Sequence, residues 1–390
     1  MKQNNSLFIY VILGLLAALA PVINNMYSPA MPSMVDFFGV SESMVQGGLM
    51  MGMLGLAVGQ LVFGPLSDRV GRRRPLLVSI VLFIISTVCI LPVTDASVFV
   101  ALRFVQGFAA AGGIVNSRSV ASDMFTDRDL LKAFAVINIV NGVAPIVTPI
   151  LGGTAVSLAG WQGVFVIMLV IGVILAAGCF MLQESLPENK RSNRSFLATF
   201  NLFGIVLRNR RFVSMLLHQA AALALLFGNI AASAFIAQHY GVNSQLHGIT
   251  LAINGIFIGI GAGMAAKLPT ALRGVRVSSI GMVAASVIVG ATLCLELGFI
   301  AYEVAVCVML CFMGITLTSS TSVALESARE HAGTASALFG AAGFLVGGMI
   351  SPIVSLGNML YSTSAVFLAG AVLAAAFAML YPRSSQHISQ

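Results

Sequence analysis

The chain has 390 residues, of which 58% are hydrophobic and only 8% are charged. Soluble domains carry about 25% charged residues, so this composition excludes a soluble protein and indicates an integral membrane protein. A membrane-spanning helix needs about 20 apolar residues, so twelve helices use roughly 240 residues and leave no room for a large soluble domain. The net charge of +7 comes from residues in the predicted loops. It therefore indicates membrane topology, and we expect no nucleic-acid partner and no cofactor.

Twelve apolar runs predict an all-helical protein with twelve spans. The longest polar segment, residues 184–211, separates six spans from six and includes a possible short amphipathic helix over 196–207. We therefore expect two six-helix bundles, residues 1–183 and 212–390, joined by a linker over 184–211. The predicted spans are approximately 7–27, 44–63, 76–93, 98–122, 132–157, 163–183, 212–238, 246–266, 277–297, 300–325, 333–356 and 361–381.

The basic residues predict the orientation of the chain. With twelve spans, all Lys and Arg residues except Arg103 and Arg118 fall on one side of the membrane. Basic loops stay in the cytoplasm, so we expect both termini to be cytoplasmic. Residues 267–276 occupy in the second half the place that 64–75 holds in the first, with the basic charge kept and the acid lost. This correspondence suggests a parallel internal repeat, as transporters use.

The densest charged run, residues 64–75, lies between the second and third spans and predicts a tight turn at the membrane surface. Glycines there permit close packing and unusual backbone angles. The run resembles the G-x-L-x-D-R-x-G-R-[RK] signature of the major facilitator superfamily, which implies alternating access by two bundles. The alternative is a solvated basic turn without a role in the cycle. The positions expected to control conformation are Gly64, Asp68, Arg69, Gly71, Arg72 and Arg73.

Arg103 is a charged residue inside the fourth span. A charge at mid-membrane costs about 2.5–3.5 kcal/mol or more, so such a residue usually faces a cavity or a partner. Gln106 lies on the same helix face. The segment resembles the family's R-F-x-Q-G motif, which implies that Arg103 faces the central cavity. The alternative is a structural arginine bonded to carbonyl groups.

Arg118 and Asp123 lie near the end of the fourth span, where the family commonly has an Arg-Asp pair. Because Arg118 is more than a turn away, we expect Asp123 to pair with the arginines that follow Asp68. Such a pair would clasp spans 2, 4 and 11 in one state of the cycle. The alternative is an ordinary surface ion pair, worth less than about 1 kcal/mol.

The fifth span contains two prolines and several glycines. Prolines bend a helix, and glycines allow close helix contacts. The run from Asn141 to Gly153 resembles the span-5 motif of the drug-antiporter branch, which implies a role in shaping and sealing the cavity. Together with residues 26–32, 161–165 and 333–338, it points to the bicyclomycin- and chloramphenicol-resistance (Bcr/CflA) group. The positions concerned are Gly142, Pro145, Pro149, Gly152 and Gly153.

One position departs from that group, which usually carries Asp where this chain has Asn25. A proton carrier needs a group whose pKa can change with exposure, and Asn cannot titrate. Asp36 and Glu303, both expected near the outer surface, are the remaining coupling candidates. The other possibilities are a cycle driven by the substrate gradient, and an anionic substrate bound directly by Arg103.

Polar or aromatic residues within the spans are candidates for the substrate site. Amides within a membrane often satisfy each other, so each is either a ligand contact or a structural contact. Cysteines all lie in apolar runs, which favours buried thiols over a metal site. The cavity candidates are Asn24, Asn25, Tyr27, Arg103, Gln106, Asn116, Asn138, Asn141, Asn229 and Asn254.

The predicted function is export of small amphipathic molecules from a bacterial cell. We expect a monomeric multidrug transporter of the inner membrane that works by alternating access and proton antiport. The first alternative is a dedicated exporter or facilitator of one metabolite, possibly anionic, without proton coupling. The distant alternative is a polytopic membrane enzyme, which would need a His/Asp/Glu or Cys/His cluster near a membrane face.

Overall fold

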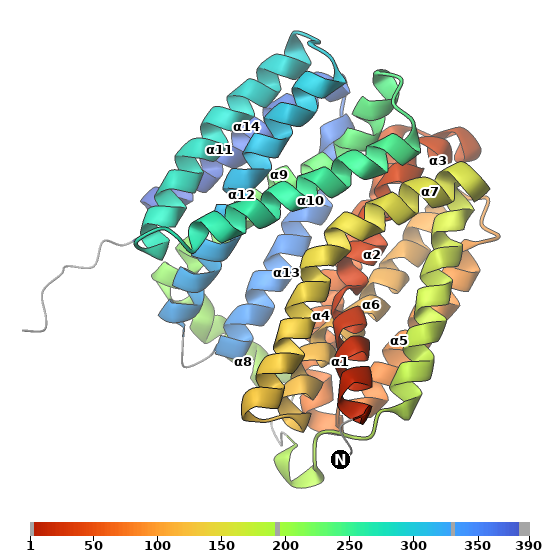
Figure 1. Cartoon of the computed structure of the whole chain (residues 1–390), viewed down its shortest axis with the longest axis vertical. Coiled ribbons are helices and arrows are strands. Elements are labelled where there is room, and N and C mark those ends of the chain that lie inside the picture. Colours follow the sequence, from red (N-terminus) through yellow and green to blue (C-terminus); the bar gives the residue numbers. More distant parts are fainter. Residues whose placement is uncertain (1–3, 192–195, 329–331, 382–390) are drawn as a thin grey trace, which may run out of the picture.

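The computed structural model describes residues 4–191, 196–328 and 332–381. Within them the protein is all-helical (Figure 1). The first half contains α1 (Asn4–Ala17), α2 (Leu19–Asn25), α3 (Met31–Phe38), α4 (Glu42–Val70), α5 (Arg73–Ile90), α6 (Ala96–Met124) and α7 (Asp127–Met181). The second half contains α9 (Arg210–His239), α10 (Ser244–Ala265), α11 (Ala271–Cys294), α12 (Phe299–Ser327), α13 (Ala332–Ile350) and α14 (Met359–Met379).

Eleven helical segments of the described chain are long and apolar enough to cross a membrane. One of them, α7, has 55 residues, a length of roughly 80 Å at 1.5 Å per residue, against about 30 Å for the hydrocarbon core. Ala159 and Gly160 interrupt it with non-helical backbone angles, and Gly160 has a φ of 66°. The two parts of α7 are the predicted fifth and sixth spans, so the described chain makes the twelve crossings that we expected.

The first span differs from the prediction. We expected the first span to end near residue 27, and Pro29 and Pro32 follow it. Instead a short 3₁₀ helix, η1 (Ser28–Ala30), connects α2 directly to α3. Both prolines occupy early positions of their helices, where a missing N–H is not needed. The first span therefore continues, with kinks, to Phe38.

The turn between the second and third spans is also shorter than we predicted. Helix α4 continues through Pro65 and Asp68 to Val70, and α5 begins at Arg73. Only Gly71 and Arg72 lie between the helices, and Gly71 has a φ of 99°, which favours glycine. Most of the expected loop is thus helical, so Asp68 and Arg72 project from the end of one span and the turn that follows it.

Helices of each half pack mainly with one another. Close helix contacts depend on glycine, as at Gly107 of α6 against Gly52 of α4, and at Gly314 of α12 against Gly261 of α10. The halves meet along α7 with α10 and along α4 with α13, which lie side by side in Figure 1. The boundaries 1–183, 184–211 and 212–390 stay a prediction.

The short helix expected in the linker is present as α8 (Phe196–Leu207), which contacts α4, α9 and α13. Arg194 of the expected linker, Arg329, and the two chain ends, with Lys2 and Arg383, lie outside the described residues. We call the end of the molecule with the connections at 71–72, 125–126 and 182–209 the basic end. The connections at 39–41, 91–95, 240–243, 295–298 and 351–358 form the opposite end.

Candidate functional site

A central cavity of about 260 Å³ lies between the two halves. Five of the predicted asparagines line it together with apolar side chains. Asn24 and Asn25 come from α2, Asn141 from α7, Asn229 from α9 and Asn254 from α10. Pro145, one of the prolines predicted to shape the cavity, also lines it. Both halves therefore supply polar groups to one space.

A second cavity of about 520 Å³, the mouth cavity, extends toward the basic end. It shares Ala20, Asn141 and Phe344 with the central cavity, so the two spaces are adjacent. Its walls come from α4 and α6 on one side and from α8 and α13 on the other, and they include Asp68 and Arg118. The central cavity is thus approached from the basic end.

The opposite end is closed by direct contacts between the halves. Ser28 Oγ donates a hydrogen bond of 2.6 Å to the carbonyl of Ile230, and Gln46 Nε2 donates one of 3.1 Å to the carbonyl of Ala231. His247 Nε2 lies 3.5 Å from Ser28 Oγ. We call these contacts, with those of the next paragraph, the seal.

Backbone contacts at glycine complete the seal. A Cβ at Gly248 of α10 would collide with the carbonyl of Pro149, and one at Gly153 of α7 with the carbonyl of Ser244. Within the first half, Gly152 of α7 is equally close to the carbonyl of Met26, whereas Gly142 has open space around it. Close approach at Gly152 and Gly153 agrees with the prediction, but Gly142 makes no such contact.

Arg103 lies inside the first bundle and is absent from the linings of both cavities. Its side chain is fully buried. Nη2 donates to the carbonyl of Ile23 at 2.7 Å, Nε donates to that of Gly48 at 3.3 Å, and Nη1 donates to Gln106 Oε1. The guanidinium also lies 4.6 Å from the centre of the Tyr27 ring. This matches the structural arginine that was the alternative interpretation.

The other predicted cavity residues are dispersed. Tyr27 is buried beside Arg103, and Gln106 donates to Thr87 Oγ1 at 2.7 Å. Asn116 donates to the carbonyl of Gly112 within its own helix. Asn138 is exposed on α7, three residues before Asn141. None of these four lines the central or the mouth cavity.

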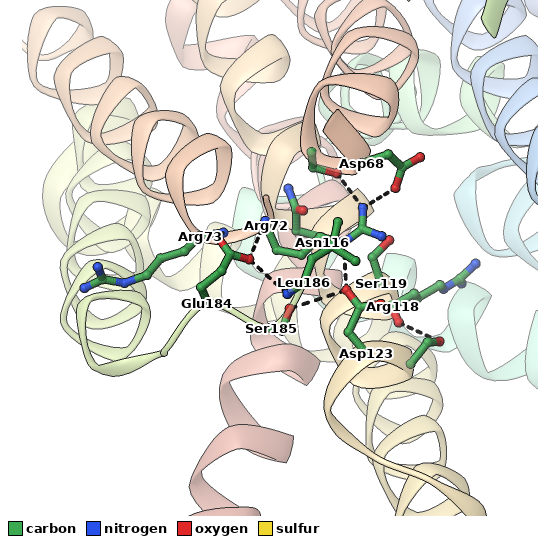
Figure 2. A network of polar contacts seen from close by, with 12 residues as sticks. Asp68, Arg72, Arg73, Asn116, Arg118, Ser119, Asp123, Glu184, Ser185 and Leu186 are labelled. Carbon is green, nitrogen blue, oxygen red and sulfur yellow. Dashed lines mark hydrogen bonds and ion pairs between the residues drawn. The ribbon is translucent and has the colours of Figure 1, made fainter. Parts of the chain in front are cut away.

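Arg72 is the centre of a polar network at the basic end (Figure 2). Nε donates to Asp123 Oδ2 at 2.8 Å, while Nη1 donates to Asp68 Oδ1 and, at 2.9 Å, to Ser67 Oγ. Burial tends to lower the pKa of Arg72, but the hydrogen bonds and charges of Asp123 and Asp68 raise it above its usual value. The predicted pairing of Asp123 with an arginine after Asp68 is confirmed.

Glu184 ties the same turn to the end of α7. Its carboxylate accepts hydrogen bonds from the backbone N–H groups of Arg72, Arg73 and Leu186. Partial burial tends to raise the pKa of Glu184, but these bonds outweigh it and hold the pKa below its usual value. A side chain at Gly71 would collide with this carboxylate. Sequence reasoning missed Glu184, although it is the first charge after the sixth span.

The network stays within the first half in this conformation. Arg72 and Asp123 join the α4–α5 turn to α6, and the described contacts of Asp68 and Asp123 do not extend to α13. The guanidinium of Arg118 points away from Asp123 (Figure 2). Arg69 is exposed, and Gly64 has only an ordinary contact with Val115. The clasp to span 11 that we expected remains a prediction for another state.

The two coupling candidates have very different surroundings. Asp36 is exposed near the end of α3. Glu303, expected near the outer surface, is only 9% exposed within α12. Its carboxyl group lies beside Thr250 and Asn254 of α10, and Oε1 has no hydrogen-bond partner among the described residues. Asn254 lines the central cavity, so it connects Glu303 with that space.

The family model for the Major Facilitator Superfamily matches residues 13–352, most of the sequence. The chain belongs to the major facilitator superfamily. It is therefore a multi-pass secondary transporter that moves small molecules across a lipid bilayer, and it is not an enzyme. The alternating-access architecture that the signature loop suggested is thus the architecture of its family.

Bacterial members of the superfamily resemble the chain along nearly its whole length. It is 33% identical to Uncharacterized MFS-type transporter YdgK of Bacillus subtilis (strain 168), over 88% of each chain. It is 26% identical to a Bicyclomycin resistance protein homolog of Haemophilus influenzae, over 100% of this chain and 99% of the relative.

A solved superfamily structure shows the same fold. The xylose transporter XylE from E. coli, in a partially occluded inward open conformation, matches with a TM-score of 0.76 and 14% identity over 99% of each chain. At this identity the likeness concerns the fold alone. The opening of the present structure follows from its own seal and mouth cavity.

Proposed function

We propose that this superfamily member exports small drug-like molecules across the bacterial inner membrane by alternating access. The observation that carries the proposal is the cavity pair between the halves, open toward the basic end and sealed at the opposite end. If the basic end is cytoplasmic, as basic loops favour, a molecule enters from the cytoplasm. Both termini are then cytoplasmic, and one copy of the chain contains the whole path.

The relatives support drug-like substrates as part of this proposal. The relative from Haemophilus influenzae is named a Bicyclomycin resistance protein homolog. Multidrug resistance protein D of Escherichia coli (strain K12) is 29% identical to this chain over 52% of its length. We further propose proton antiport with Glu303 as the titrating group, because Glu303 is buried and adjoins a cavity residue. Asp36 is the second candidate but is exposed.

The alternative is a dedicated exporter or facilitator of one metabolite without proton coupling. It is favoured by Asn25 at the place of the usual acid, and by the lack of an ionisable side chain in the described lining of the central cavity. An anionic metabolite would need a cation at the site, and Arg103 is already bonded to protein groups. We therefore rank this alternative second.

Flux through purified protein in liposomes tests the proposal. We expect at least one compound of a drug panel to move, and its flux to increase when a pH gradient is imposed. Gly248→Ala should abolish this flux because the new methyl group collides with Pro149 and prevents the seal from closing. Gly263→Ala, on the same helix with open space around it, should transport normally.

Two results would contradict the proposal. If no compound of the panel moved under any gradient, drug export would be wrong. If flux were unaffected by the pH gradient, the uncoupled alternative would replace proton antiport.

A further inference from the structure

The described lining of the central cavity combines five amides with no ionisable group. Asn24, Asn25, Asn141, Asn229 and Asn254 supply its polar surface, and the rest consists of Leu, Ile, Phe, Ala, Pro and Gly. An amide presents both donors and an acceptor. The described lining can therefore form hydrogen bonds of either direction but offers no counter-charge.

Two of these amides have an atom left without a protein partner. Tyr302 donates to Asn229 Oδ1 at 2.7 Å, and Cys307 Sγ lies 3.4 Å from Asn254 Oδ1. Nδ2 of Asn229 and Oδ1 of Asn24 are buried without a hydrogen-bond partner among the described residues, whereas the Asn254 amide lies against the Glu303 carboxyl group. Buried polar groups normally find partners, so these atoms are available to a bound molecule.

The charged groups nearest to this space are not in its lining. Arg103 is buried behind it, with its N–H groups donated to Ile23, Gly48 and Gln106. Glu303 lies behind Asn254. In the mouth cavity, Asp68 and Arg118 carry opposite charges. An ion that entered the central cavity would lose its hydration without a counter-ion in the described lining, which is costly.

We propose that the central cavity binds uncharged molecules that have several hydrogen-bonding groups and an apolar face, and that it discriminates against cations and anions alike. The proposal deepens the proposed function and rests on it, because it treats this cavity as the transport site. The amides select by hydrogen bonding, and the walls of Leu, Ile and Phe hold the apolar part of the molecule.

Three near-isosteric probes test this selectivity: 4-phenylbenzamide, 4-phenylbenzamidine and biphenyl-4-carboxylate, which are neutral, cationic and anionic at neutral pH. Binding to the full chain in lipid nanodiscs is measured by calorimetry, with empty nanodiscs as the blank. We expect the neutral amide to bind at least about tenfold more tightly than either ion, because an unpaired buried charge is strongly disfavoured.

Two neighbouring asparagines provide the matched variants. Asn141→Leu should weaken binding of the neutral amide by about fivefold, the usual effect of losing one hydrogen bond. Asn138→Leu, three residues earlier and exposed, should leave it unchanged. Asn25→Asp places a carboxylate in the lining and should shift the preference toward the amidine.

Equal or tighter binding of either ion to the unaltered protein would overturn the proposal, as would equal affinities of the Asn141 and Asn138 variants or no binding of the neutral amide. These are binding measurements and need no transport. A result that overturns the selectivity proposal would therefore still leave the proposed export function possible, with charged compounds as substrates. Selective binding without any flux in liposomes would instead contradict the proposed function.

Discussion

The fourth span of each half carries one buried charged side chain near its start, but the two are held very differently. Arg103 of α6 has protein acceptors for Nε and both terminal nitrogens and an aromatic ring over its face. Glu303 of α12 lies beside two polar side chains and has one oxygen without a partner in the described part of the chain. Every nitrogen of the first charged group thus donates to a protein acceptor, whereas one oxygen of the second has no partner among the described residues.

This difference separates a structural charge from one that is able to change its state. A guanidinium bonded to two carbonyls and an amide holds α2, α4 and α6 together, and moving it would expose all of its acceptors. A carboxyl group with an unpaired oxygen can gain a proton without breaking a bond to the protein. We therefore place the structural role in the first half and the coupling role in the second.

The largest expected effect is on stability at Arg103. Arg103→Ala should destabilise the protein by about 3–5 kcal/mol, because three buried acceptors lose their donor. Thermal unfolding and recovery of monodisperse protein in detergent measure this. Arg103→Lys should recover only part of the stability, since an ammonium group cannot reach acceptors on three sides. An Arg103→Ala protein that stays stable but no longer transports would instead favour the cavity role predicted from the sequence.

A change at Glu303 should affect coupling and leave stability largely intact. Glu303→Gln keeps the shape but cannot release a proton, so we expect stability within about 1 kcal/mol of the unaltered protein and flux that no longer responds to a pH gradient. Glu296→Gln and Asp36→Asn, both exposed, are the controls and should keep the response. If Asp36→Asn lost it while Glu303→Gln kept it, the coupling site would be in the first half.

The smallest expected effect is on stability, at the arginines that follow the second span of each half. Arg72→Ala removes hydrogen bonds to two carboxylates, so we expect a loss of about 1–3 kcal/mol in the free energy of unfolding. Arg276, in the second turn of α11, makes no ion pair within the described residues, and Arg276→Ala should change stability by less than about 0.5 kcal/mol. If thermal unfolding showed equal losses of stability for Arg72→Ala and Arg276→Ala, the network around Arg72 would not contribute more to stability than an unpaired arginine does.

Patterns along the chain predict the spans and the pairing of Asp123 well, because apolar length and one-sided charge are properties of the sequence itself. They predict side-chain direction poorly. Arg103 and Gln106 do share a helix face, but helical spacing does not say whether that face meets α4 or the cavity. Glu303 illustrates the same limit, since its burial results from packing against α10. The convergence of Asn229 and Asn254 with Asn24 likewise depends on how the halves meet.

The seal also has a mechanical consequence. Gly153 and Gly248 meet main-chain carbonyls of the facing helix rather than side chains, so no interlocking side chains have to be withdrawn when the halves move apart at this point. Backbone surfaces in such close contact leave no space for a solute between the helices, and the helices can separate there without any change of side-chain rotamer. Separation of the halves at this end must also break the hydrogen bonds that Ser28 and Gln46 donate to the carbonyls of Ile230 and Ala231.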